Sequence, residues 1–108
     1  MSDDTIITFA REVLDAESKA LAAVAATLNN DFVMAVEYIR TARQVVVAGI
    51  GKSGIIARKI AATLSSVGTP AVFLHPVEAL HGDMGILHPD DVCILLSKSG
   101  TTTELLQL

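Results

Sequence analysis

The sequence predicts an α/β fold, in which a parallel sheet carries helices on its faces and is preceded by two helices. Two observations support this prediction. Apolar residues follow a helical period up to about Ala42, and short β-branched runs alternate with helical segments after residue 44. Strands that alternate with helices pair in parallel, because each helical crossover brings the chain back to the same end of the sheet.

One long helix is predicted over residues 5–28, where apolar side chains recur at spacings of three and four. These side chains are Ile6, Phe9, Ala10, Val13, Leu14, Leu21, Val24, Ala25 and Leu28. Residues 29–31 break this helix, and Asp31 is expected to cap a second one that runs to about Ala42. The apolar face of the long helix exceeds what one small core requires, which predicts a homo-oligomer.

Three short strands are predicted at 45–48, 71–74 and 92–96, because each is a short apolar run and the first is largely β-branched. A helix is expected at 55–67 with Gly68 as its cap, a short helical turn at 76–81, and a further helix from about Thr101. A sheet of three strands is narrow, so the chain is expected to be the first part of a larger domain. Some side chains are predicted to have no role in a site: Cys93 as a small core residue, and Lys19, Arg40, Arg43, Arg58 and His88 as solvated groups.

Composition excludes several classes of protein. The 108 residues are 51% hydrophobic and 19% charged, which argues against disorder, and the net charge of −4 argues against binding to nucleic acid. No apolar run reaches the length of about 18 residues that a membrane span needs. The acidic start at 1–4 does not resemble a secretion signal, and the single cysteine fits a reducing compartment, so a cytoplasmic location is expected.

A glycine-rich segment, Gly49-Ile50-Gly51-Lys52-Ser53-Gly54, joins the first predicted strand to its helix. Its backbone amides and Lys52 suit an anion. A dinucleotide fits the G-x-G-x-x-G spacing, but Leu74-His75 stands where an acidic residue should hold the ribose. An ATP-binding P-loop would need glycine where the chain has Val46. Two interpretations of the segment remain. It binds a sugar phosphate, or it has a purely structural role in which the glycines permit a sharp turn and Ser53 caps the helix.

A second candidate loop, Ser97 to Glu104, follows the third predicted strand and carries five hydroxyl groups. Hydroxyls at the start of a helix suit a phosphate dianion, because each can rotate to donate a hydrogen bond. Glu104 has two interpretations. It closes a capping box with Thr101, or it is a general base one turn away from a bound phosphate. The carboxyl ends of parallel strands share one edge of the sheet, so both loops are expected to lie there.

Several of these motifs together closely resemble the sugar isomerase (SIS) domain. They are the strand and loop of residues 45–54, then Gly68-Thr69-Pro70, then His75-Pro76-x-Glu78-Ala79-x-His81-Gly82-Asp83, then Ser97-x-Ser99-Gly100. The stretch from His75 to Asp83 is the most discriminating, and within the SIS domains it resembles the arabinose-5-phosphate isomerase family. The resemblance covers nearly the whole chain.

The resemblance implies a three-layer α/β/α sandwich, a flavodoxin-like arrangement, with residues 1–44 as a helical segment and 45–108 as the first part of the SIS domain. It implies an isomerase that interconverts D-arabinose 5-phosphate and D-ribulose 5-phosphate for Kdo biosynthesis, without a cofactor, in a cytoplasmic homotetramer. It implies catalytic roles for Lys52 and Glu104. The substrate-contacting positions that it implies are Gly51, Ser53, Gly68, Thr69, His75, His81, Ser97, Ser99, Thr101 and Thr102. A non-catalytic SIS module that senses a phosphosugar remains the alternative.

Three histidines, His75, His81 and His88, lie in one loop-rich stretch with Glu78 and Asp83. Such nitrogen and oxygen ligands can assemble a zinc site. The spacing matches no recognised zinc motif, so no metal is expected to be required, and incidental metal binding is expected only at His75.

Overall fold

The computed structural model describes residues 1–100 of the chain, apart from the side chains of Asp83 and Met84. The helix predicted from Thr101 lies outside the described residues. Contacts within the chain define two compact units, residues 1–35 and residues 36–108, and each is described by itself.

The first unit consists mainly of helix α1, Asp3–Thr27, which confirms the predicted long helix. The Ser2 hydroxyl caps it by accepting a hydrogen bond from the Thr5 amide at 3.2 Å, and Asp3 and Asp4 place negative charge at the positive end of the helix dipole. None of its side chains is buried, and Leu21 is 72% exposed. Among the described residues, no helix has both the length and the apolar character needed to cross a membrane.

Helix α2, Asn30–Thr41, starts at a different cap from the one predicted. The Asn29 side chain accepts a hydrogen bond from the Asp31 amide at 2.9 Å, so Asn29 holds the capping position and Asp31 lies inside the first turn. Near its end, Ile39 packs against the core of the second unit.

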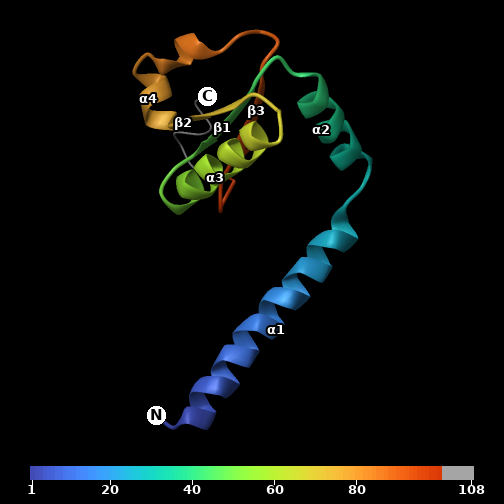
Figure 1. Cartoon of the computed structure of the whole chain (residues 1–108), viewed down its shortest axis with the longest axis vertical. Coiled ribbons are helices and arrows are strands. Elements are labelled where there is room, and N and C mark those ends of the chain that lie inside the picture. The colour runs from blue at the N-terminus through green and yellow to red at the C-terminus, as the bar shows by residue number, and fades with distance from the viewer. Residues whose placement is uncertain (101–108) are drawn as a thin grey trace. The chain divides into compact units, whose positions relative to one another are not determined.

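A parallel sheet forms the centre of the second unit (Figure 1), and it confirms the predicted fold class. Its strands are β1, Val45–Gly49, β2, Ala71–Leu74, and β3, Val92–Leu96, in the order β2-β1-β3. Val45 pairs with Ala71 on one side and with Val92 on the other. The described sheet is therefore centred on β1, whose residues are all buried.

Helices cover both faces of β1. On one face, Val45 and Val47 pack against Ala57 and Ala61 of helix α3, Lys52–Ser66. On the other face, Val46 and Leu74 pack against Ala79 of helix α4, Pro76–Leu80, which is followed by the 3₁₀ helix η1, Asp83–Ile86. Alternate side chains of a strand point to opposite faces, which accounts for the burial of the whole central strand.

Cys93 is exposed in the described chain, so the prediction that it is a core residue is wrong there. Cys93 and Leu95 point to the same face of edge strand β3, and Leu95 is 46% exposed. On that face the packed cluster of α4 and Leu87 lies over β1 and β2. The sequence pattern showed an apolar strand but not which neighbours would cover it.

The end of α3 confirms that Gly68 terminates it, one residue beyond the C-cap Val67. Gly68 has a φ of 93°, its amide donates to the Ser65 carbonyl at 3.2 Å, and the Thr69 amide donates to the Leu64 carbonyl at 2.9 Å. This pair of bonds is the Schellman motif, which satisfies carbonyls at the end of the helix. Gly68 and Thr69 therefore precede β2 and lie at the amino edge of the sheet.

Candidate anion-binding site

The two candidate loops start side by side at the carboxyl edge of the sheet. One follows β1 and the other follows β3, and these strands are hydrogen-bonded neighbours in which Gly49 pairs with Leu96. Ligands of open parallel sheets bind beyond this edge, next to the helix N-termini. The expectation that both loops lie at one edge is thus confirmed as far as Gly100.

An open hollow of about 510 Å³ lies between α3 and the loop after β3. It is lined by Lys52, Ser53, Ile56, Leu95, Leu96, Ser97 and Lys98. The structure thus brings together three of the predicted site residues, Lys52, Ser53 and Ser97. No acidic side chain is among the described residues that line the hollow.

Helix α3 begins earlier than predicted, so Lys52 and Ser53 lie in its first turn rather than in a loop. Gly51 is the N-cap, with φ 61° and ψ −129°, and no side chain caps the helix, so the alternative that Ser53 is the cap is wrong. The first helical bond runs from the Ile55 amide to the Gly51 carbonyl. The amides of residues 52–54 precede it and have no acceptor among the described residues, which leaves them available to an anion.

Two glycines allow β1 and the first turn of α3 to touch backbone to backbone. A Cβ atom on Gly49 would lie 2.7 Å from the Ser53 carbonyl oxygen, and one on Gly54 would lie 2.7 Å from the Gly49 carbonyl oxygen. Real Cβ atoms do not approach backbone so closely. The glycine spacing therefore has a structural reason of its own, close packing of helix on strand, in addition to any contact with a ligand.

The second loop is a compact turn as far as it is described. The Ser97 hydroxyl accepts a hydrogen bond from the Gly100 amide at 2.9 Å, and Gly100 has a φ of 73°. Ser99 lies in this turn and is exposed. Thr101, Thr102 and Glu104 lie outside the described residues, so their roles stay predictions.

His75 follows β2 and serves as the N-cap of α4. Its Nδ1 accepts a hydrogen bond from the Val77 amide at 3.1 Å, so a neutral ring carries its proton on Nε2. The ring packs edge-on against Phe73, with centroids 6.4 Å apart, and the Arg58 guanidinium lies 4.0 Å above the Phe73 ring. Arg58 is thus engaged in a cation–π contact, and the prediction of a purely solvated group is wrong for it.

The remaining predicted site residues lie elsewhere. His81 is the exposed C-cap of α4, and its amide donates to the Glu78 carbonyl at 3.1 Å. Gly68 and Thr69 lie at the opposite end of β2, a strand of four residues and so about 13 Å long. Within one chain they are not brought to the hollow. Among the described residues, no group of three or more His, Cys, Asp and Glu side chains could hold a metal ion.

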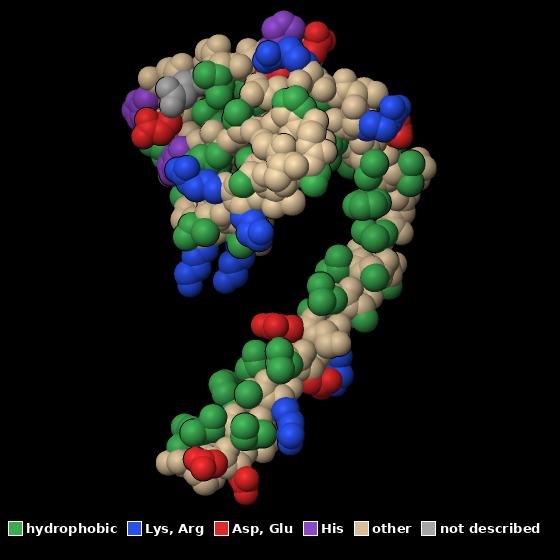
Figure 2. All heavy atoms as spheres, viewed as in Figure 1, with side chains coloured by type: hydrophobic (Ala, Val, Ile, Leu, Met, Phe, Trp, Pro, Cys, Tyr) green, Lys and Arg blue, Asp and Glu red, His purple; other side chains and the backbone are tan. Residues whose placement is uncertain are grey.

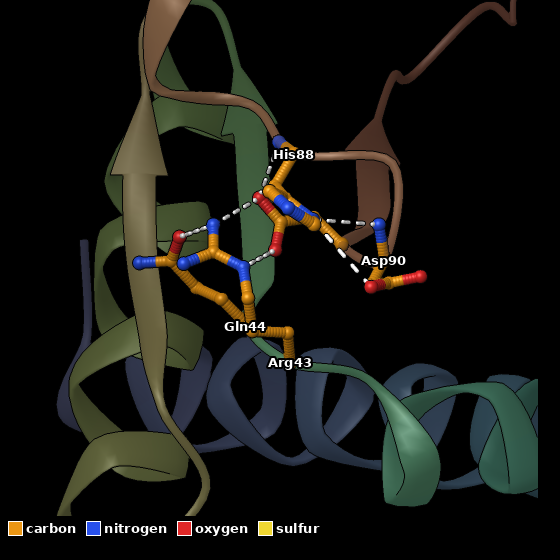
Figure 3. Close-up of polar contacts among 5 residues, drawn as sticks. Arg43, Gln44, His88 and Asp90 are labelled. Atoms are coloured by element: carbon orange, nitrogen blue, oxygen red, sulfur yellow. Dashed lines mark hydrogen bonds and ion pairs between the residues drawn. The ribbon is translucent and has the colours of Figure 1, made fainter.

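A second hollow, of about 530 Å³, lies at the amino edge of the sheet and is lined partly by Arg43 and Asp91. Arg43 follows α2 and binds Asp91 through two hydrogen bonds of 2.9 Å, which come from its Nε and Nη2 atoms (Figure 3). The Asp91 side chain is only 2% exposed and also accepts from the His88 amide at 2.9 Å. The prediction that Arg43 is a solvated helix residue is therefore wrong, and its charge is already neutralised.

The Arg43–Asp91 ion pair determines the charge of the amino-edge hollow. The hydrogen bonds from Arg43 lower the pKa of Asp91 below its ordinary value of 3.8. His88 is half exposed, as predicted for a solvated group, and its Nδ1 accepts from the Asp90 amide at 3.1 Å. Because its one arginine is paired with a carboxylate, this hollow does not suit an anion, and the carboxyl-edge hollow is the better candidate site.

Comparison with known proteins identifies the family. The SIS domain family model matches residues 38–108 of the chain. This chain belongs to the SIS domain family.

Relatives within the family are close over this region. The chain is 47% identical to the arabinose 5-phosphate isomerase KdsD of Pseudomonas aeruginosa over 100 residues, which is 92% of this chain and 31% of that protein. It is 46% identical to KdsD of Escherichia coli over 99 residues, which is 91% of this chain and 30% of that protein. The chain thus spans about a third of the length of these curated relatives.

A solved structure of similar fold contains a sugar-phosphate ligand. This complex of the E. coli CFT073 protein c3406 superposes with a TM-score of 0.91 at 42% identity, over 99% of this chain and 57% of that one. The α/β arrangement of the SIS chain, with its parallel sheet and N-terminal helices, therefore matches a solved structure.

Sequence reasoning missed three features of the site. Lys98 stands between the two serines of the second loop, but the motif drew attention to the hydroxyls and not to this cation. Ile56 and Leu95 line the hollow because α3 lies beside β3, which only the strand order reveals.

Proposed function

We propose that this chain forms the sugar-phosphate-binding region of an isomerase that interconverts D-arabinose 5-phosphate and D-ribulose 5-phosphate. One observation carries the proposal: the hollow at the carboxyl edge joins Lys52 and Ser53 of α3 to Ser97 of the second loop. The names of the relatives, and the sugar phosphate bound to a protein of similar fold, support a substrate of this kind. The product would enter Kdo biosynthesis, as the resemblance implies.

The phosphate would be held by the first turn of α3 and by the second loop. The amides of residues 52–54 and the hydroxyl of Ser53 supply donors at a helix N-terminus, where the dipole favours an anion. Ser97, Ser99, Thr101 and Thr102 would complete this set. Gly51 would contribute through its positive φ, which directs the first amides of the helix towards the ligand.

Isomerisation moves one proton between adjacent carbons of the sugar. A base removes the proton from C2 of the aldose, the C1–C2 double bond forms as the C1–O1 double bond opens, and O1 takes a proton to give an enediol. The O2 hydroxyl then loses its proton as the C2–O2 double bond forms, and C1 takes up a proton to give the ketose. Glu104 is the proposed base. Lys52 would stabilise the negative charge that develops on O1, the carbonyl oxygen of the aldose. His75 and His81 would donate hydrogen bonds to sugar hydroxyls.

No cofactor enters this scheme, because both electrons stay within the sugar. We propose no contact between the substrate and Gly68 or Thr69 of the same chain, because these residues precede β2 and lie at the edge of the sheet opposite the hollow. We propose for them the structural role of ending α3. Residues 1–44 would form a helical segment, and 45–108 the first part of the SIS domain.

Binding and turnover test the proposal separately. NMR titration of this chain with D-arabinose 5-phosphate should shift the amide resonances of residues 51–54 and 97–100, whereas D-arabinose should not. Turnover is measured on the protein that contains this chain, by coupling D-ribulose 5-phosphate formation to a colour reaction. Lys52→Ala and Glu104→Gln should each lower kcat about 10²-fold or more.

Each outcome points to one conclusion. Normal turnover in both variants would refute the proposed mechanism. Binding of the sugar phosphate without turnover in the intact protein would favour a phosphosugar-sensing module over an enzyme. Absence of binding to this chain would remove the proposed site itself.

Assembly and location are proposed on separate grounds. Phe9 and Leu14 on the apolar face of α1 are each 65% exposed, which supports a homo-oligomer. The resemblance implies that this oligomer is a tetramer. Light scattering that gave only monomer at tens of micromolar would contradict it. A cytoplasmic location is supported by Cys93, the single cysteine of the chain, which has no partner for a disulfide within it.

A further inference from the structure

The basic side chains of the second unit fall into two groups. Arg40 is paired with Glu37 at 2.8 Å, and Arg43 is paired with Asp91 at 2.9 Å. The other group consists of Lys52, Arg58, Lys59 and Lys98, which form no ion pair with any described residue. In Figure 2 several blue side chains gather in the lower part of the sheet-containing unit with no red side chain visible between them, whereas the blue side chains at its top and right lie next to red ones.

Only two of the unpaired lysines line the carboxyl-edge hollow. Lys52 reaches it from the first turn of α3, and Lys98 reaches it from the turn that follows β3. Lys59 is exposed farther along α3 and does not line the hollow. Arg58 is held over the Phe73 ring.

Strand pairing and a hydrogen-bonded turn position the backbone that carries the two lysines. β1 and β3 are paired up to Gly49 and Leu96, so the segments that carry Lys52 and Lys98 leave the sheet side by side. The hydrogen bond from the Gly100 amide to the Ser97 hydroxyl closes the turn that presents Lys98. The two lysines therefore reach the same hollow from two directions.

Two ammonium groups around one hollow repel each other, and no carboxylate among the described residues lines the hollow to offset them. An anion that enters is attracted by both. A phosphate monoester carries close to two negative charges at neutral pH, because its second pKa is about 6, whereas a sulfate monoester of the same shape carries one. A site with two cations and few carboxylates should distinguish these two ligands by charge alone.

Resting on the proposed function, we propose that Lys98 is the cation that contacts the phosphate, and that its charge, added to the field of Lys52 in the same hollow, selects a dianionic phosphate monoester. Lys98 is thus a specificity-determining residue. Its flexible side chain contributes charge and up to three donated hydrogen bonds, and it leaves the C1–C2 chemistry to other groups.

The test compares two ligands and three variants in this 108-residue chain. D-Arabinose 5-phosphate and D-arabinose 5-sulfate are titrated at about pH 7.5, where the phosphate is mostly dianionic, by NMR or calorimetry. The variants are Lys98→Gln, which removes the charge, Lys98→Arg, which keeps it, and Lys59→Gln, a matched control that removes the same charge from outside the hollow. Both lysines are exposed, and an NMR spectrum of each variant verifies the fold.

The unchanged chain should bind the phosphate about tenfold more tightly than the sulfate. Lys98→Gln should lose about tenfold in affinity for the phosphate and only about two- to threefold for the sulfate, so that most of the preference disappears. Lys98→Arg should keep the preference, and Lys59→Gln should change both affinities less than about twofold at roughly 0.15 M salt, where distant charges are screened.

Unchanged selectivity in Lys98→Gln would overturn the role of Lys98 while leaving the proposed function intact. An equal loss in Lys59→Gln would also overturn it, because the effect would then come from net charge and not from the hollow. If the unchanged chain binds no phosphate ester, both the inference and the proposed function fail. If Lys98→Gln behaves as expected but the intact protein has no isomerase activity, the inference stands and the proposed enzyme function fails.

Discussion

Replacing Gly54 by alanine tests how closely the fold and the site depend on each other. The new Cβ atom would lie 2.7 Å from the Gly49 carbonyl oxygen and 3.3 Å from its carbonyl carbon. Ordinary contact begins at 3.4 Å, so β1 and the first turn of α3 would have to separate by about 0.7 Å. Both sides of the contact are backbone, so no side chain can rotate to relieve it.

The cost follows from two opposing effects. Forcing an extra methyl group into a packed contact costs about 1–3 kcal/mol, while alanine is favoured over glycine inside a helix by about 1 kcal/mol. Because neither side of this backbone contact can rotate away, the cost should lie near its upper value of about 3 kcal/mol. The net destabilisation of Gly54→Ala should therefore be about 2 kcal/mol, which lowers the Tm of a domain of this size by about 10 °C. Because Lys52 and Ser53 share the displaced turn, affinity for a sugar phosphate should also fall about tenfold.

Urea unfolding followed by circular dichroism measures the first effect, and NMR titration measures the second. Gly85→Ala is the matched control, because a Cβ atom there meets nothing within 4 Å and its φ is not positive. The control should stay within about 0.5 kcal/mol of the unchanged chain. If Gly54→Ala unfolds at the same midpoint as Gly85→Ala, the close approach does not constrain the fold and the reasoning is refuted.

Three further predictions concern single side chains. Since Arg43 lowers the pKa of Asp91, this carboxylate stabilises the fold fully above its ordinary pKa of 3.8, and the stabilisation is lost as the pH falls through the lower pKa of the folded state. Asp91→Asn should lower the urea midpoint at neutral pH and should make that midpoint fall less steeply below about pH 4. An equally steep fall of the midpoint in both proteins would contradict this. His75→Asn should retain the hydrogen bond from the Val77 amide, whereas His75→Ala should lose about 1 kcal/mol of folding stability. Affinity for the sugar phosphate should fall in both variants. An alanine variant that is as stable as the unchanged chain and binds fully would refute both the capping role and the binding role of His75. Cys93 is exposed but partly desolvated, and this desolvation, with the charge of Asp91 as a second cause, raises the pKa of its thiol. At about pH 8 a disulfide reagent should therefore label Cys93 more slowly in the folded chain than in urea, and equal rates would show an unperturbed thiol.

The regular elements of the fold were predictable because their signals are local. The run Val45-Val46-Val47-Ala48 is apolar enough to be buried on both faces, and the structure buries it completely. The spacing of apolar residues in α1 has a helical period over its whole length. Gly68 stands where apolar periodicity stops, and it ends α3 in the left-handed conformation. Such features depend on residues within one or two turns of each other.

The start of α3 was not predictable to the residue. Three glycines, Gly49, Gly51 and Gly54, lie within six positions, and the sequence does not reveal which one adopts a positive φ. In the structure it is Gly51, so the helix begins at Lys52, while the other two glycines are needed for close contact. This difference moves Lys52 from a loop to the first turn of a helix, where its position is more rigid.

Contacts between distant residues were missed for a different reason. Arg43 and Asp91 are 48 positions apart, and the sequence around Arg43 looks like an ordinary helix end. The contact arises because Val45 pairs with Val92 in register, which brings the residues before the two strands together. Strand order and register decide it, and neither can be read from local pattern.

The same register explains why the two edges of the sheet differ in charge. At the amino edge it brings Arg43 to Asp91, and the pair neutralises itself. At the carboxyl edge it aligns two segments that each carry a lysine, and the described residues lining the hollow supply no carboxylate to either. The N-terminus of α3 adds partial positive charge at that same edge, where the helix follows β1. Among the described residues, positive charge from two sources therefore accumulates at the carboxyl edge without a carboxylate beside it, and an anionic ligand relieves it.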